Sequence, residues 1–428
     1  MNPVLNFSSF EHFAGFDWAR QTHAIVVVDR HGAIVLQREV EQTAEGWATL
    51  RQQLQPLGQL AVAIETSSGP AVERLLEIGL SVYPMNPKAA ERYRDRKAPS
   101  GVKDDFLDAF SFADALRTDG HAWRILHPDD EQTRLLRMLC RDEIALIGQR
   151  TALANALQQA LYEYYPAALE AFDEWTASPA WEFLVQFPTP AELVRAGKRK
   201  WQKFFHAHRL YQKPMAEKRM EIFARADRFA SSSAAVTEAK SLLAVSLTRQ
   251  LRTLEQQLQE YRRRIEKLFQ QHPDHDLFGS LPGAGPKLAP RLLGELGSQR
   301  QVLDSPEALQ CYAGTAPVTK KSGKTRFVFL RRACNTVLRA TVHLWVDLSR
   351  HQCAWAEAYY QKKRQEGKSH ATALRCLGQR WLKILWRMWQ DRVPYNEALH
   401  TLSQVRHGSW VIGLLPANPQ LEPNEVTR

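Results

Sequence analysis

The first third of the chain alternates short apolar runs with amphipathic stretches. A β-branched run at residues 24–28 and a second run at residues 33–36 flank the turn sequence DRHG, which predicts two strands joined by a tight turn. An amphipathic helix is expected near residues 44–54, followed by the buried strand QLAVAIETS, the helix AVERLLEIGL and a short strand ending at Pro84. This alternation indicates an α/β domain spanning residues 1–125.

The central part of the chain shows the apolar period of long helices instead. Residues 131–163 form one helix candidate, and a second carries apolar residues spaced alternately by four and three positions: Leu247, Leu251, Leu254, Leu258, Tyr261, Ile265 and Leu268. This heptad seam predicts a helical coiled-coil region over residues 126–272, in which the two helices either pair as an antiparallel hairpin or mediate dimerisation. An insert at about residues 166–230 contains Pro, Trp and many basic residues.

Residues 273–395 are expected to form a mainly helical C-terminal domain. Its first segment, LFGSLPGAGPKLAPRLLGELG, resembles a helix-hairpin-helix module, in which the amides of Gly283 and Gly285 contact a DNA phosphate because no side chain blocks the approach. A plain turn between two helices explains the same glycines equally well. Residues 396–428 are expected to form a tail, whose last segment, GLLPANPQLEPNEVTR, is expected to be disordered.

Charge is distributed unevenly along the chain. The whole sequence has a formal charge of +11 and a pI near 9.4, but residues 316–388 alone contain sixteen Lys or Arg against three acids, Asp347, Glu357 and Glu366. A single basic region of this kind suits a nucleic-acid backbone, because each neutralised phosphate releases a condensed counterion. A solvated charged face is the alternative.

Apolar runs and cysteines exclude several other classes of protein. No stretch reaches the roughly 18 consecutive apolar residues of a membrane span, and the N-terminal MNPVLNFSSFEHF lacks the basic start and apolar run of a signal peptide. The five cysteines are odd in number and lack paired CxxC spacing, which argues against a disulfide framework or a zinc knuckle. We therefore expect a cytoplasmic protein with no membrane partner.

Four carboxylates from three segments are candidates for a metal site. Asp105 and Asp108 are spaced i, i+3, which places their Cβ atoms about 5–6 Å apart on one helix face, while Asp17 and Glu65 end short apolar runs. Converging anions need a cation, and two Mg²⁺ ions, or Mn²⁺ in their place, would neutralise them and clamp a phosphodiester. Helix caps or surface charges are the alternative for each acid singly, and Asp104 is expected to be such a cap.

A serine lies among cations in the sequence YAGTAPVTKKSGKTRFVFLRRACN. Ser322 is surrounded by bases that could stabilise a phosphoryl group and contact nucleic acid: Lys320, Lys321, Lys324, Arg326, Arg331 and Arg332. Two rival hydroxyls, Thr319 and Thr325, lie close by. A basic loop that binds phosphate passively is the alternative, because no His-Asp relay is apparent near the serine.

Taken together, the motifs GFDWAR, AIETS, KDDFLDA, LPGAG and YAGTAPVTKKSGKTR resemble those of the DEDD transposases of bacterial insertion sequences, also called bridge-RNA-guided recombinases. The resemblance runs from about residue 13 to 391, although the middle matches only in being helical. It implies an N-terminal RuvC-like domain of RNase H fold, a coiled coil and a C-terminal transposase domain that carries a serine.

The resemblance also implies roles for particular residues. Asp17, Glu65, Asp105 and Asp108 match the metal-binding acids of the family, and Ser322 matches its nucleophile, which would form a covalent phosphoserine link to DNA. Family members use a non-coding bridge RNA to select donor and target DNA. They act as homodimers that assemble into tetramers, and a nucleoid-associated location follows.

Three other functions fit parts of the same pattern. The first is a metal-dependent RNase H-fold nuclease or junction resolvase that works without covalent catalysis. The second is an actin-like ATPase or sugar kinase, because GFDWAR followed by VVDRHG also resembles the phosphate-binding hairpin of that fold, although no later glycine-rich nucleotide-binding turn follows. The third is a non-enzymatic nucleic-acid binder with structural acids.

Overall fold

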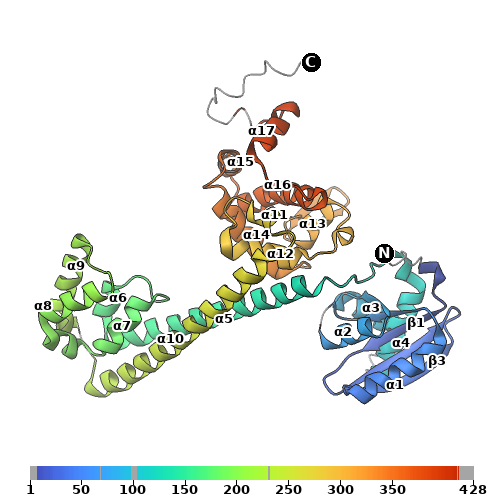
Figure 1. The fold of residues 1–428 in the computed structure, drawn as a ribbon, viewed down its shortest axis with the longest axis horizontal. Helices are drawn as coiled ribbons and strands as arrows, with labels where there is room; N and C mark the ends of the chain where they lie inside the picture. Colours follow the sequence, from blue (N-terminus) through green and yellow to red (C-terminus); the bar gives the residue numbers. More distant parts are fainter. Residues whose placement is uncertain (1–6, 68, 98–103, 230–231, 412, 414–428) are drawn as a thin grey trace. The chain divides into compact units, whose positions relative to one another are not determined.

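The computed structural model describes residues 7–67, 69–97, 104–229, 232–411 and 413. The chain forms two compact units, one up to Asp129 and one from Asp130 onward, which are described separately here (Figure 1). Five short 3-10 helices connect the larger elements: η1 Phe7–Ser9, η2 Gln55–Leu57, η3 Gly120–Ala122, η4 Ala226–Phe229 and η5 Arg300–Val302.

The first unit is built on a five-stranded mixed sheet. Its strands are β1 (His12–Asp17), β2 (Thr22–Asp29), β3 (Ile34–Glu41), β4 (Leu60–Ile64) and β5 (Ser81–Pro84), in the order β3-β2-β1-β4-β5. The first three pair antiparallel, whereas β4 runs parallel to β1 and β5 runs parallel to β4. The α/β pattern is confirmed, but the single strand pair predicted before residue 40 was an undercount, because the segment ending at Asp17 is itself a strand.

Helices cover both faces of this sheet. On one face lie α1 (Ala44–Leu54) and α2 (Pro70–Glu77), whose Trp47, Leu50 and Leu75 pack with the even-numbered apolar residues of β1 and β4. On the other face α4 (Asp105–Asp119) packs on β1, β2 and β4, with α3 (Pro87–Lys97) beside it. The sequence did not predict α3, because its single buried residue, Ala90, leaves the helix with almost no apolar stripe.

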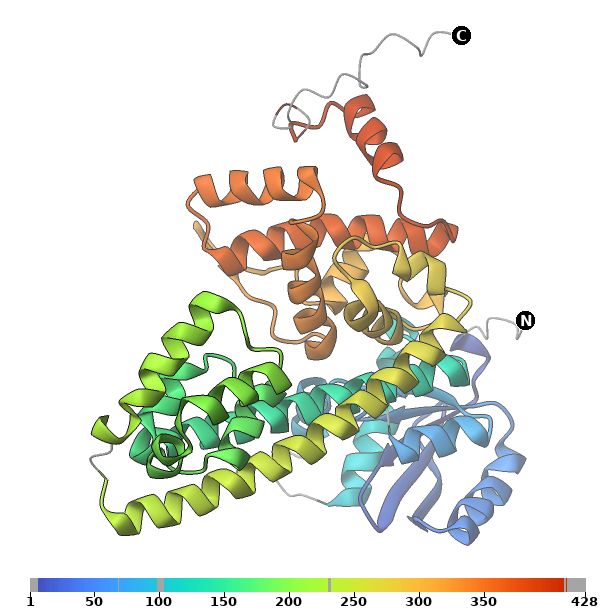
Figure 2. The same cartoon turned by 60° about the vertical axis from the view of Figure 1, so that its left-hand side comes forward.

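The second unit is organised around two long helices, α5 (Glu131–Tyr164) and α10 (Ala234–Gln270), which lie side by side in both cartoon views (Figures 1 and 2). They run antiparallel, because Arg150 pairs with Glu255 while Glu163, further along α5, pairs with the earlier Lys240. The predicted helix pair therefore forms within one chain. The seam leucines from Leu247 to Leu258 are buried, and Leu268 is partly buried.

The insert between the two long helices is a helical lobe. It contains α6 (Pro166–Ala171), α7 (Ser178–Gln186), α8 (Pro190–Ala207) and α9 (Lys213–Ala224). Its core is aromatic: Phe183 stacks on Phe223, and Trp181 and Phe204 are buried in the same cluster. The lobe therefore shares one hydrophobic core with the end of α5 and the beginning of α10.

The C-terminal part packs on the opposite end of the helix pair. Its helices are α11 (His275–Gly279), α12 (Gly285–Leu296), α13 (Pro306–Tyr312), α14 (Thr336–Ser349), α15 (Ala354–Gln365), α16 (His370–Asp391) and α17 (Glu397–Arg406). Glu143 of α5 is buried and forms ion pairs with both Arg262 of α10 and Arg291 of α12. The buried carboxylate is therefore neutralised by arginines from two other helices, which links the three helices.

The C-terminal part is mainly helical, as predicted, but it also contains two strands that the sequence did not predict. Here β6 (Val318–Ser322) and β7 (Thr325–Phe329) form an antiparallel hairpin rich in β-branched and aromatic residues. The predicted tail begins with a helix, α17, which is capped by the side chain of Asn396. Residues 414–428, in the segment predicted to be disordered, lie outside the described residues.

Among the described residues, every helix is too short or too polar to span a lipid bilayer.

Candidate active site

Asp17 and Glu65 end two adjacent parallel strands. The pairing of β1 with β4 runs from His12 opposite Leu60 to Phe16 opposite Ile64, and continuing this register sets Asp17 opposite Glu65. Side chains alternate between the faces of a sheet, and the odd-numbered residues of both strands face α4. Both carboxylates therefore emerge on the α4 side of one sheet edge, as expected for site residues of α/β folds.

A close helix crossing brings α4 over this edge. A Cβ atom on Gly15 of β1 would lie 1.8 Å from the carbonyl oxygen of Ala109, so the strand and helix backbones touch where only glycine fits. Asp104 caps α4 by accepting a hydrogen bond from the Leu107 amide at 3.0 Å, which confirms it as the helix cap. Asp105 and Asp108 then occupy the first turn, with Asp105 exposed and Asp108 buried.

The other three acids lie near enough to Asp17 to affect its carboxyl group. The pKa of Asp17 is raised from its usual value to about 6, first by burial and then by the nearby carboxylates of Asp108, Asp105 and Glu65. Carboxylates from two other chain segments, up to 91 positions away, therefore act on the carboxyl group of Asp17. The expectation that the acids share one region of the fold agrees with this geometry.

Arg94 of α3 lies at the same cluster, and the sequence reading missed it. Its Nη1 donates to Oδ2 of Asp108 at 2.9 Å, and the side chains are 29% and 3% exposed. The pKa of Arg94 is raised even though burial opposes this, because the hydrogen bond with Asp108 and the charges of Asp108, Glu65 and Asp17 outweigh burial. The available signal was the run of bases in AERYRDRK, directly upstream of the acidic stretch.

The donor set fits Mg²⁺ in kind but is not closed into a ligand shell. Carboxylate oxygens are the hard ligands that Mg²⁺ prefers. Among the described residues, however, no group of three or more His, Cys, Asp or Glu side chains is arranged closely enough to hold a metal ion. The metal site predicted at Asp17, Glu65, Asp105 and Asp108 therefore stays a prediction.

Ser322 lies in the second unit, at the tip of the β6–β7 hairpin. It pairs with Thr325 across a turn in which Gly323 takes a φ of +56°. Residues 319–330 are all exposed, including the predicted nucleic-acid ligands Lys320, Lys321, Lys324 and Arg326. The rival Thr325 shares a face of the hairpin with Ser322, whereas Thr319 lies on the other face, because facing alternates along a strand.

The remaining predicted DNA contacts divide into free and engaged groups. Arg332 is exposed, whereas Arg331 donates through Nε to the carbonyl of Ala316 at 3.2 Å. The Gly283 amide donates to Oε1 of Gln352 at 2.7 Å, and a Cβ atom there would lie 2.5 Å from the Ser349 nitrogen. Gly283 thus serves close packing against α14, while Gly285 has open space around its Cα.

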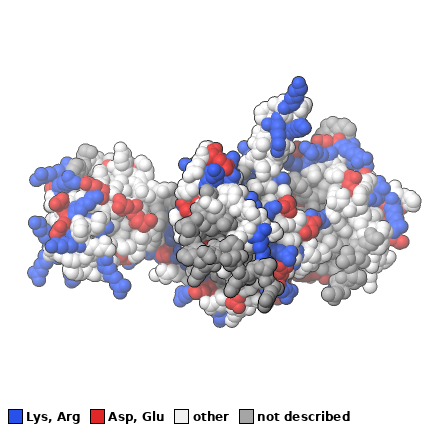
Figure 3. Space-filling view, turned by 90° about the horizontal axis from the view of Figure 1, so that it is seen from above, with Lys and Arg blue, Asp and Glu red and all other residues white. Residues whose placement is uncertain are grey.

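A further basic surface lies on the helical lobe. Around a kink at Gly197, α8 carries five exposed bases: Arg195, Lys198, Arg199, Lys200 and Lys203. Figure 3 shows Lys and Arg side chains projecting from this lobe, on the left of that view. The sequence predicted a basic insert but no individual nucleic-acid contacts within it, because the apolar pattern there did not define helix boundaries.

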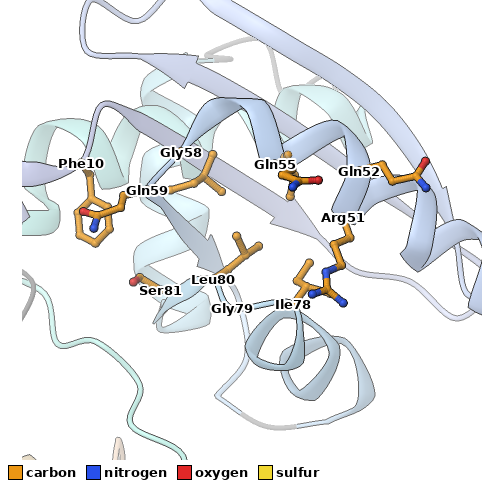
Figure 4. Close-up of a pocket in the computed structure, with 12 residues that line it drawn as sticks. Phe10, Arg51, Gln52, Gln55, Gly58, Gln59, Ile78, Gly79, Leu80 and Ser81 are labelled. Atoms are coloured by element: carbon orange, nitrogen blue, oxygen red, sulfur yellow. The ribbon is translucent and has the colours of Figure 1, made fainter. Parts of the chain in front are cut away.

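A cavity of about 520 Å³ lies in the first unit, away from the acids (Figure 4). It is lined by the end of α1 and by the residues that lead into β4 and β5, including Arg51, Gln55, Gln59 and Ser81. These side chains stand at the start of the parallel strands, whereas Asp17 and Glu65 stand at their ends. The cavity is therefore separate from the acidic edge.

Two family models match the chain. One, described as transposase, matches residues 14–166, and another, described as the transposase IS116/IS110/IS902 family, matches residues 275–361. The first range includes all four acids and the second includes Ser322.

Curated relatives agree with these matches. The protein named "Mini-circle putative transposase for IS117" of Streptomyces coelicolor is 34% identical over 397 residues, which cover 90% of this chain and 95% of the relative. "Putative transposase y4uE" of Sinorhizobium fredii is 33% identical over 46% of this chain and 57% of its own length. A 44.8 kDa protein of insertion element IS116 in Streptomyces clavuligerus is 26% identical over 90% of this chain and 96% of its own.

Proposed function

We propose that this chain, which belongs to the IS116/IS110/IS902 family of transposases, cuts and rejoins DNA with the carboxylates of its first unit and the serine of its second. The observation that carries the proposal is the register of β1 and β4, which sets Asp17 beside Glu65 under the first turn of α4. The strand order, with three antiparallel strands and two parallel ones, supports assigning the first unit to the RuvC-like RNase H type.

The acids and the serine have separate tasks in this proposal. The carboxylates of Asp17, Glu65, Asp105 and Asp108 would hold Mg²⁺, which would neutralise phosphate charge and stabilise the attacking and leaving oxygens. The Ser322 Oγ attacks the phosphorus, so an Oγ–P bond forms as the bond to the leaving deoxyribose oxygen breaks, and the serine proton ends on that oxygen or on water. Lys320, Lys321, Lys324 and Arg326, exposed around the serine, offset the growing negative charge.

Replacing Ser322 with Ala tests the covalent step. The change should abolish cleavage and the protein-linked DNA seen on a denaturing gel, while Thr319→Ala, on the opposite face of the hairpin, should leave both intact. A Ser322→Ala protein that still cuts would favour the nuclease or resolvase reading. If instead Thr325→Ala removes the adduct and Ser322→Ala does not, then Thr325 is the nucleophile.

Guidance by a structured RNA and assembly beyond a single chain belong to the same proposal. The exposed bases of α8 support an RNA partner, because they lie apart from the hairpin that would contact DNA. Sequencing the nucleic acid that copurifies with the chain expressed beside its flanking element tests this. Recovery of one structured non-coding RNA is expected, and recovery of bulk cellular RNA alone would contradict guidance. Sedimentation with and without that RNA should show a dimer that assembles into a tetramer with DNA.

A further inference from the structure

Two aromatic rings share the face of the β6–β7 hairpin that carries Ser322. Residues directly opposite one another in an antiparallel pair point to the same face. The register pairs Ser322 with Thr325, Lys320 with Phe327 and Val318 with Phe329. Phe327 is thus a diagonal neighbour of Ser322, about 7–8 Å away between Cα atoms. The opposite face carries Thr319, Lys321, Arg326 and Val328.

These rings are open to solvent. Phe327 is 57% and Phe329 48% exposed, their ring centres lie 6.2 Å apart, and Nζ of Lys320 lies 5.7 Å from the ring centre of Phe329. Every residue from 319 to 330 is exposed, so no core covers either face of the hairpin within this described segment. A two-stranded hairpin is only marginally stable by itself, and exposed apolar rings on it indicate a surface that acquires a partner.

Charge identifies the class of that partner. Lys320 lies on the same face as the rings and Lys324 lies in the turn, while Lys321 and Arg326 project from the opposite face of the hairpin. The sequence contains no Asp or Glu between Glu307 and Asp347. Aromatic rings interleaved with cations are the combination that binds single-stranded nucleic acid, because bases stack on the rings while the cations track the phosphates. In duplex DNA the faces of the bases are stacked on one another, so a duplex would contact the cations through its phosphates but would not stack on the rings.

We infer that Phe327 and Phe329 form a stacking platform for unpaired DNA bases beside the phosphodiester at Ser322. The platform deepens the proposed function and rests on it for the role of Ser322, but base stacking itself is measured without any chemistry. The rings would hold the strand while the hydroxyl, on the same face, reaches its backbone. Phe327, the closer ring, should matter more than Phe329.

The test is equilibrium binding by the full chain carrying Glu65→Gln, which prevents cutting. The probe is a single-stranded DNA oligonucleotide containing the fluorescent base 2-aminopurine, with the matching duplex and a single-stranded RNA as further arms. Stacking is worth about 1–3 kcal/mol per base, so Phe327→Ala should weaken single-strand binding about tenfold and the Phe327→Ala, Phe329→Ala pair further, with loss of the fluorescence quench. Phe327→Trp should retain both.

Val328→Ala is the matched control. Val328 is 60% exposed on the opposite face of the same strand, so its removal takes away a similar apolar group without touching the platform. Its affinity should stay within about twofold of the parent, and duplex binding should change little in any of these variants. Melting curves should be unchanged, because the replaced side chains are exposed.

Several outcomes would overturn the platform. They are unchanged single-strand binding by the double variant, an equal loss in Val328→Ala, an equal loss on duplex, or a loss confined to RNA. A changed oligomeric state with unchanged DNA binding would assign the rings to a second copy of the chain instead. The proposed function fails by a different measurement, since the phosphoserine adduct and its loss in Ser322→Ala are scored in the chain with Glu65 intact.

Discussion

Asp17 and Glu65 end strands of a sheet with a buried core on both faces, whereas Ser322 sits at the tip of a hairpin whose residues 319–330 are all exposed. Contacts within the first unit hold the acids in place, including the close approach of the Gly15 and Ala109 backbones. The hairpin has no comparable packing in the described residues. The proposed catalytic groups therefore differ in how they are positioned: folding of the first unit fixes the acids, whereas Ser322 lies on an exposed hairpin.

The largest effect is expected from the acids. Glu65→Gln keeps the shape of the side chain but removes its charge, so Mg²⁺-dependent DNA cleavage should fall about a thousandfold while DNA binding is nearly retained. Asp105→Asn should behave alike. Asp104→Asn is the control, because Asn caps helices as well as Asp does, and cleavage should persist. Full activity in Glu65→Gln would remove the metal role of this edge.

A stability test targets the helix crossing. Gly15→Ala places a methyl group on the Ala109 carbonyl, so α4 must shift, and the free energy of unfolding should fall by about 3 kcal/mol in a urea titration. Gly148→Ala is the control: it lies in α5 with open space around it and should stabilise by about 0.5–1 kcal/mol. An unchanged Gly15→Ala protein would mean that α4 is not held there.

Arg94 tests what balances the acids. Arg94→Gln leaves Asp108, whose side chain is 3% exposed, without its charged partner, so stability in EDTA should fall by about 1–3 kcal/mol. Added Mg²⁺ should then raise the melting temperature more in the variant than in the parent, because a cation again offsets Asp108. Arg92→Gln, exposed on the same helix, is the control and should do neither. Equal Mg²⁺ responses would argue against a cation site at Asp108.

A smaller effect concerns pH. The pKa of Asp17 is about 6 in the folded state and 3.8 in the unfolded state, so the folded protein keeps this proton up to a higher pH. The contribution of Asp17 to stability in EDTA therefore falls as the pH rises from about 4 to 6 and is constant above that range. Asp17→Asn removes this loss. Since Asp17 is partly exposed, the variant should be more stable by on the order of 1 kcal/mol at pH 7 and equal below pH 4. If Asp17→Asn were less stable than the parent at pH 7, the result would contradict a destabilising effect of burial and of the neighbouring carboxylates on charged Asp17.

The smallest effect is expected in the hairpin. Gly323 takes a φ of +56° with open space around it, and Asn tolerates that conformation. Gly323→Asn should therefore change the free energy of unfolding by less than about 0.5 kcal/mol in the same titration as Gly15→Ala. A large loss would show that the hairpin is packed into the fold and would end the contrast between the two regions.

Local pattern was enough for much of the fold. The buried strand at residues 60–64, the helix at residues 44–54, the long helices and the cap at Asp104 all follow from apolar period and capping chemistry. The pattern failed where elements are nearly all polar, as in α3, or nearly all exposed, as in β6 and β7, because neither has a buried stripe to read. For the same reason Arg94 was not predicted.

By itself, the sequence determined which residues are candidates for the chemistry and that they come from separate segments, because residue type and local spacing can be read directly from the chain. Only the tertiary structure decided that Asp17 stands opposite Glu65, that α4 crosses at Gly15, and that Arg94 reaches Asp108. Strand register and helix crossing depend on contacts between residues far apart in the chain, and no local pattern contains them.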